Sequence, residues 1–141
     1  MIKQSKLIEL EALTNTLQNL NTEAEDFFVE VAKKDGYEVD FYNHVKPFAD
    51  HVKYVREKWL PLAIEFVQHA KPLHLHPVQL SQTEENLEIV AIKSFYSNTS
   101  RKRQMETFKS VSYVLTQLKL AIDQYKKRVN KTSLSFYMYS F

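Results

Sequence analysis

The residues with the clearest potential for chemistry are three histidines that lie close together in the chain, His69, His74 and His76. His74 and His76 are two apart, so an extended backbone would point both rings the same way, and His69 could add a third ligand for zinc. The alternative is that these imidazoles are exposed or cap a helix. Because one loop and one helix end would have to bring three ligands together, we predict no bound metal.

Other catalytic patterns are missing from the sequence. A di-iron or di-manganese bundle needs Glu-x-x-His pairs, and none of the five histidines has Glu or Asp three residues before it. Glu65 precedes His69 by four, which gives one pair where two are required. Ser/His/Asp catalysis needs a strained turn and an oxyanion hole, which a chain with a single Gly does not supply, and a Gly-rich phosphate loop is also missing. We therefore expect neither a cofactor nor enzymatic activity.

A basic run, Arg101-Lys102-Arg103, opens the last predicted helix, and Lys109 follows two turns later. Positive charge at a helix N-terminus opposes the helix dipole, so this choice indicates a function such as contact with an acidic partner or a phosphate group. The structural explanation, which we favour, is that the cations lie beside the last carbonyls of the preceding helix, where they would be favourable. Weak nucleic-acid binding through the same four cations is an alternative function.

The end of the chain changes character, because residues 134–141 are uncharged, aromatic and richer in strand formers than in helix formers. Such a segment is an exposed apolar liability unless it folds onto the protein or onto a partner, and we expect packing against the protein itself. We predict that residues 130–141 form a tail separate from the helical domain. Its candidate interaction residues are Phe136, Tyr137, Tyr139 and Phe141.

Length and composition limit the fold and the compartment. The 141 residues suit one domain, and one Gly with four Pro favours long helices with few turns. A formal charge of +2 is too small for attraction of the whole molecule to nucleic acid or lipid, and the lack of cysteine suits a reducing compartment. Because no stretch approaches about 18 uncharged apolar residues, we expect a cytoplasmic protein that does not span a membrane.

Apolar residues recur in alternating steps of three and four along most of the chain, which predicts amphipathic helices. The expected helices cover about 3–34, 40–70, 77–98 and 101–129. Helices of matched length joined by short connections predict an all-α, up-and-down antiparallel four-helix bundle over residues 1–129. The expected core includes Leu17, Trp59, Leu87 and Leu118.

Three residues set the expected helix limits and bends. Gly36 can take the left-handed conformation that closes the first helix, and Asp40 suits the N-cap of the second. Pro61 lies well inside the second helix and removes one backbone hydrogen bond. Because the apolar stripe keeps its phase across Pro61, we predict a kink there and not a break.

Several short motifs appear in a recognisable order between about residues 40 and 125. They are Asp40-Phe41-Tyr42, Val45-Lys46-Pro47, Trp59, Lys71-Pro72-x-His74-x-His76, Glu85-Asn86-Leu87, Ser94-Phe95-Tyr96, Arg101-Lys102-Arg103, and Ser112 with Leu115. In this order they resemble the YppE-like proteins of Bacillus and related Firmicutes. The resemblance implies a compact four-helix fold and a cytoplasmic bacterial protein, and it implies no mechanism because that family is functionally uncharacterised.

Together these features predict a non-catalytic interaction or regulatory protein whose partner is another bacterial protein. The expected contact surfaces are the outer faces of the bundle, with the basic run and the aromatic tail as further candidates. We expect the chain to be a monomer or a weak homodimer. Nucleic-acid binding at residues 101–103 and metal binding at residues 69–76 are the alternatives.

Overall fold

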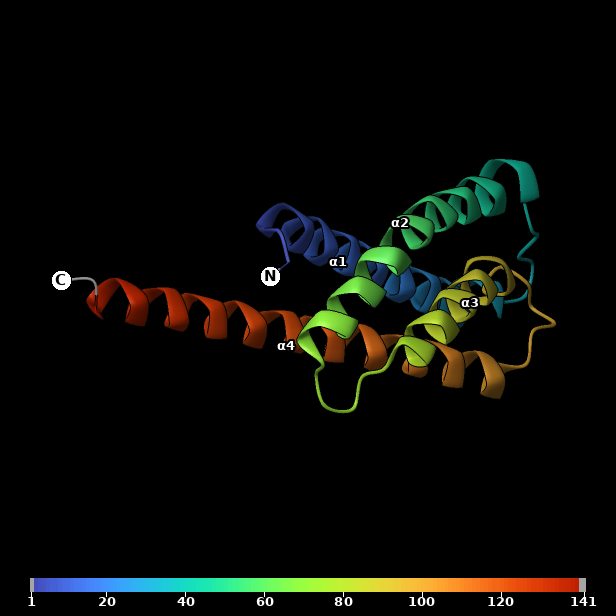
Figure 1. Ribbon diagram of the computed structural model, residues 1–141. Helices are drawn as coiled ribbons and strands as arrows, with labels where there is room; N and C mark the ends of the chain where they lie inside the picture. Colours follow the sequence, from blue (N-terminus) through green and yellow to red (C-terminus); the bar gives the residue numbers. More distant parts are fainter. Residues whose placement is uncertain (1, 140–141) are drawn as a thin grey trace.

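The computed structural model describes residues 2–139, with side chains described as far as Lys131. Its four α-helices are α1 (Gln4–Phe27), α2 (Lys46–Ala70), α3 (Pro77–Lys93) and α4 (Arg101–Tyr139). Each helix runs antiparallel to the next, and α1 and α3 each contact both α2 and α4, so the helices close into a ring (Figure 1). The predicted all-α four-helix bundle is confirmed, since every regular element within residues 2–139 is helical.

The inward stripes of the four helices meet in one core that runs along the bundle. The four expected core residues, one from each helix, are all fully buried: Leu17, Trp59, Leu87 and Leu118. Burial of large apolar side chains is the main favourable term in folding, so this shared interior stabilises the arrangement of all four helices.

Two widened helical turns flank the connection between α1 and α2. The π-helical segment η1 (Phe28–Ala32) continues α1, and η2 (Phe41–Val45) leads into α2. Asp40 is the N-cap of η2, because its carboxylate accepts a hydrogen bond of 3.1 Å from the backbone N–H of Asn43. This bond satisfies a helix-terminal donor that would otherwise lack a partner, and it confirms the predicted cap.

Gly36 takes a left-handed conformation, with φ of +83°, in the turn after η1. A Cβ added at this position would meet nothing within 4 Å, so the requirement for glycine comes from the backbone alone. We expect Gly36→Ala to lower the free energy of unfolding by about 1 kcal/mol, and Gly36→Asn by less, because Asn tolerates this region better. Urea denaturation measures both, and equal stability of the Ala variant and the wild type would contradict the argument.

Helix α2 continues through Pro61 and bends along its length without breaking (Figure 1). The ring of Pro61 lies on an exposed face, where the missing backbone N–H leaves the carbonyl one turn earlier accessible to water. Trp59 and Ala63, on the opposite face, stay fully buried. The bend therefore keeps the apolar stripe of α2 against the core.

The last two helices differ from their expected limits. Helix α3 ends at Lys93, five residues before the expected limit at 98, and tight turns follow, with Phe95 N–H donating to Ile92 and Tyr96 N–H to Lys93. Helix α4 runs to Tyr139, so residues 130–139 extend this helix where a separate tail is expected. No Gly or Pro follows Pro77, so nothing in the sequence breaks the backbone hydrogen bonds of α4.

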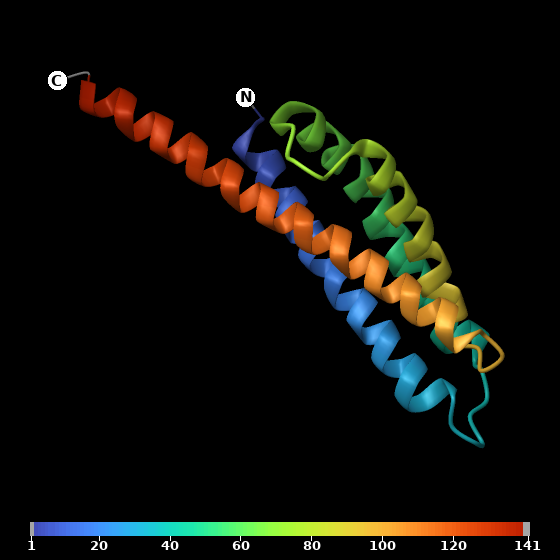
Figure 2. The ribbon, with the colours of Figure 1, turned by 90° about the horizontal axis from the view of Figure 1, so that it is seen from below.

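The C-terminal part of α4 projects beyond the other three helices. Figures 1 and 2 both show this part, in red, extending past the start of α1 and the end of α2. A helix of this length spans about 58 Å at 1.5 Å per residue, which is longer than its neighbours can cover. Within the described residues, no helix is both long enough and apolar enough to cross a membrane.

Candidate interaction site

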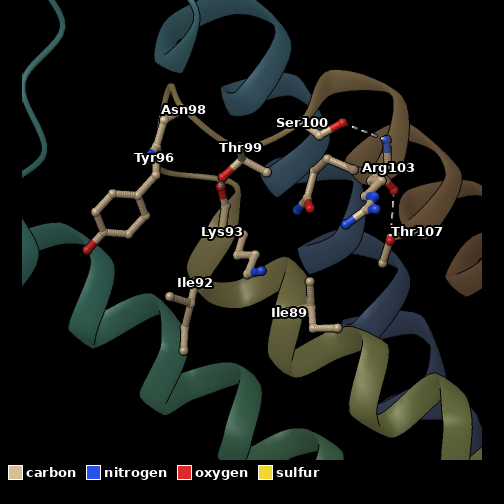
Figure 3. Close-up of a pocket in the computed structure, with 10 residues that line it drawn as sticks. Ile89, Ile92, Lys93, Tyr96, Asn98, Thr99, Ser100, Arg103 and Thr107 are labelled. Atoms are coloured by element: carbon tan, nitrogen blue, oxygen red, sulfur yellow. Dashed lines mark hydrogen bonds between the residues drawn. The ribbon is translucent and has the colours of Figure 1, made fainter.

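A hollow of about 640 Å³ lies where the end of α3, the connecting turns and the start of α4 meet (Figure 3). We call it the basic hollow, because its two charged side chains are Lys93 and Arg103. Its lining residues are Ile89, Ile92, Lys93, Tyr96, Asn98, Thr99, Ser100, Arg103, Gln104 and Thr107. The hollow therefore combines an apolar side from α3 with hydroxyl groups and a cation from the start of α4.

A buried hydrogen-bonded chain forms the base of this hollow. Gln104 is only 2% exposed, and its side-chain amide donates to the hydroxyl of Ser94 at 2.9 Å. That hydroxyl donates in turn to the carbonyl of Val90 at 2.6 Å. Buried polar groups with partners hold a fixed geometry, so the first turn of α4 is tied to the last turn of α3.

A cation from a different element holds the connection between α3 and α4. The ammonium of Lys33, just after η1, donates to the carbonyls of Ser97 at 2.8 Å and Thr99 at 2.6 Å. Hydrogen bonds from a charged donor are stronger than those from a neutral donor, so this contact fixes the connection between α3 and α4 against the end of η1. Lys33 thus holds two carbonyls of the connection that follows α3, and among the described residues the basic run does not bind them.

The four predicted basic residues, Arg101, Lys102, Arg103 and Lys109, are all exposed. None of them forms an ion pair with a residue that the structure describes. Arg103 lines the basic hollow together with Thr107, four residues later on the same face. Lys102 and Lys109 are seven residues apart and share a different face of α4, so the structure brings only one of the four cations into the hollow.

Tyr37 lies in the connection between η1 and η2, and its ring packs edge-on against that of Phe27, with the two ring centroids 5.4 Å apart. Its hydroxyl is buried and has no hydrogen-bond partner among the described residues. Burial raises the pKa of this phenol above its usual value, and nearby Tyr96 and Asp40 raise the pKa further. The phenol is therefore neutral at ordinary pH, and the charge of this end of the bundle comes from its lysines and arginines.

The three candidate metal ligands have separate surroundings. His76 is the N-cap of α3: its backbone carbonyl accepts from the N–H of Gln79 at 3.0 Å, and the Gln79 side chain accepts from the N–H of His76 at 2.7 Å. His69 packs against Tyr125 with ring centroids 6.1 Å apart, and His74 is exposed with φ of +65°. In the part of the chain that the structure describes, no three His, Asp or Glu side chains group as metal ligands.

The aromatic candidates lie at the other end of α4. Phe136, Tyr137 and Tyr139 belong to the projecting helix, with side chains outside the described part, and Phe141 lies outside the described residues altogether. At 1.5 Å per residue, residue 136 lies roughly 50 Å along the helix from residue 101. The basic run and the aromatic segment are therefore two separate surfaces and not one site.

Several residues of the hollow are not among the sequence candidates. Ile89 and Ile92 are apolar, but they do not lie on the stripe of α3 that faces the core. Apolar residues outside that stripe are the sequence feature that could have predicted an apolar outer face. Gln104 occupies an inward position of α4, where a polar residue indicates a buried bonded network. The role of Lys33 carries no sequence signal, because its partners are more than sixty residues away in the chain.

A closed ring of four antiparallel helices, with a basic hollow at one end, defines a small four-helix-bundle protein. The sequence profile of a bacterial domain of unknown function, DUF1798, matches residues 14–122. The chain belongs to this family. The match ends within α4, so the projecting part of that helix lies beyond the shared domain.

Three solved structures show the same fold. A protein of unknown function from Listeria innocua is 25% identical, with a TM-score of 0.80 over 86% of this chain and 97% of its own. The YppE protein of Bacillus subtilis is 21% identical, with a TM-score of 0.79 over 90% and 99%. A DUF1798 domain from Staphylococcus aureus is 22% identical, with a TM-score of 0.65 over 86% and 99%. The expected YppE-like resemblance is confirmed, and no curated protein matches the chain.

Proposed function

We propose that this protein is a non-catalytic interaction module that binds an acidic surface of another protein through the start of α4. The observation that carries the proposal is a set of exposed cations that form no ion pair with any residue the structure describes. Arg101, Lys102 and Arg103 occupy the first turn of a long helix, where their charge opposes the helix dipole. Lys33, and not these residues, binds the carbonyls of the adjoining turn.

The geometry of this end also suits a binding surface. The first turn of α4 is held by the buried contact between Gln104 and Ser94, so its cations project from a rigid support. A rigid surface loses little conformational entropy when a partner binds. Complementary charge would steer an acidic partner toward this end and raise the association rate.

Charge reversal tests the proposal by affinity capture. The variant carries Arg101→Glu, Lys102→Glu and Arg103→Glu, and the bait is the full chain in a Bacillus subtilis extract. We expect the enrichment of the specific partner to fall by about tenfold or more, because three attractions become repulsions. Acidic residues are favourable in a first helical turn, so the variant should keep its thermal stability and the loss cannot come from unfolding.

The matched control places the same charge change at the opposite end of the bundle, as Lys3→Glu, Lys127→Glu and Lys131→Glu. These three lysines are exposed, and the control should retain the partner. Equal loss in both variants would show a general charge effect and contradict the proposal. If the reversed variant loses only a DNA or RNA interaction that weakens steeply with salt, nucleic-acid binding replaces protein binding as the function.

A further inference from the structure

The outer face of α3 carries an apolar stripe that no element of the described chain covers. Ile89 and Ile92 are 39% and 41% exposed, and Tyr96 is partly exposed just beyond the end of the helix. The spacing of three residues places Ile89 and Ile92 on the same side of α3, and Tyr96 follows in the turn after the helix. Figure 3 shows Ile89, Ile92 and Tyr96 bordering the same hollow.

A second hollow, of about 290 Å³, lies on the other side of α3, against η2 and α2. Its apolar residues include Phe41, which is 44% exposed, and Ile92, which also lines the basic hollow. Because α2 and α4 flank α3 in the ring, Ile92 forms a ridge between the two hollows. A ridge between two grooves is the shape into which side chains of another helix interlock.

The two hollows beside this ridge differ in the charged side chains that line them. Lys93 and Arg103 border the basic hollow, and its lining includes no acidic residue. Lys53 borders the second hollow, and like the other two cations it forms no ion pair with a described residue.

The second hollow is lined by acidic as well as basic side chains. Asp50 is paired with Lys46 at 2.8 Å, and Glu88 lies 4.0 Å from Arg56. Positive charge without an acidic neighbour therefore borders the ridge on the side of α4, while Lys53 and the exposed Glu88 both border it on the side of α2. The cations on the α4 side are complementary to acidic side chains on that flank of a partner.

We propose that the outer face of α3 binds an acidic amphipathic helix of another protein, a proposal that rests on the proposed interaction function and specifies its partner. The apolar residues of that helix pack over Ile92 into both hollows. Its Asp and Glu side chains face Lys93 and Arg103 on the flank toward α4. The described chain offers helical grooves and no strand edge, so the partner is recognised as a helix in a groove and not as an added strand.

Titration with a synthetic peptide, followed by the amide NMR signals of the full-length protein, tests this inference. The peptide has about 18 residues, enough for five helical turns, with Leu along one face at three-four spacing and Glu along one flank. We expect shifts concentrated at Phe41, Ile89, Ile92, Lys93 and Arg103. A peptide with the same composition in scrambled order should bind at least about tenfold more weakly, because it has no apolar face.

Two variants separate the apolar and electrostatic contributions. Ile92→Asp should weaken binding by about tenfold or more, while Leu120→Asp, a similar change at a 50% exposed position of α4, should leave it unchanged. Lys93→Glu with Arg103→Glu should reverse the preference, so that a peptide with Lys in place of Glu binds better. Absence of shifts at these residues, equal binding of the scrambled peptide, or equal effects of Ile92→Asp and Leu120→Asp would overturn the inference.

The capture experiment keeps this inference distinct from the proposed function. If Ile92→Asp retains the native partner while reversal of residues 101–103 loses it, the α3 groove is not the contact surface but the interaction function stands. If neither variant loses a partner, the proposed function fails as well. Shifts at the groove with vesicles of anionic phospholipid, but not with the peptide, would identify a membrane surface as the ligand and contradict the proposal.

Discussion

Trp59→Ala should destabilise the protein by about 3–5 kcal/mol, among the largest effects of any single substitution in the chain. Trp59 is fully buried where α2 faces α1, and its indole N–H donates to the hydroxyl of Thr14 at 3.1 Å. The substitution removes the ring, leaves a cavity between helices and takes a donor from a buried hydroxyl. Since small domains are stable by only about 5–15 kcal/mol, much of the population should unfold on mild heating.

Two further variants show which part of Trp59 matters. Trp59→Phe keeps most of the apolar volume and loses the hydrogen bond, so it should cost much less, about 1–2 kcal/mol. Tyr54→Ala, on the same helix at a 59% exposed position, should change stability by no more than about 0.5 kcal/mol. Chemical denaturation followed by circular dichroism measures all three, and a Trp59→Ala variant as stable as Tyr54→Ala would contradict the assignment of the core.

The same core explains why the sequence predicts the fold well. Leu17, Trp59, Leu87 and Leu118 lie on four stripes, and their spacing alone identifies the buried face of each helix. The local signals at Gly36 and Asp40 also depend only on neighbouring residues, and the structure places both as expected. Patterns that act over one or two helical turns are therefore sufficient for the helices and for their arrangement as a bundle.

The end of α4 shows where local composition misleads. The aromatic residues after 133 favour strands in isolation, yet α4 continues through them to Tyr139. A helix that is already formed adds residues at little cost, because each one fixes a single residue for one hydrogen bond. Propensity is a weak signal beside this cooperativity when no Gly or Pro interrupts the backbone.

The interaction site is less predictable than the fold because it depends on contacts between distant segments. The sequence identifies Arg101, Lys102 and Arg103 as cations in an unfavourable place. It does not show that Lys33 binds the carbonyls of Ser97 and Thr99, since only the packing of η1 beside the turn brings these groups together. The connection between α3 and α4 is thus held by a distant lysine, while Arg101, Lys102 and Arg103 stay exposed.

Arg56→Ala should cost about 3 kcal/mol, because it leaves the carboxylate of Glu84 largely buried without its partner. Arg56 of α2 and Glu84 of α3 form an ion pair whose side chains are only 11% and 17% exposed. Glu88, 60% exposed and 4.0 Å from the same guanidinium, contributes little because water screens its charge.

Replacing both partners at once reveals what the pair contributes. The variant with Arg56→Met and Glu84→Leu should be as stable as the wild type or more stable, since apolar side chains of similar volume avoid the cost of dehydrating two charges. Breaking the exposed pair between Lys6 and Glu65, whose side chains are 42% and 48% exposed, should cost at most about 1 kcal/mol. A double-mutant cycle in urea measures the coupling, and equal costs at both pairs would show that burial does not govern their strength. Because Arg56 also lines the hollow beside Ile92, the double variant tests in addition whether the proposed groove depends on this pair for its shape.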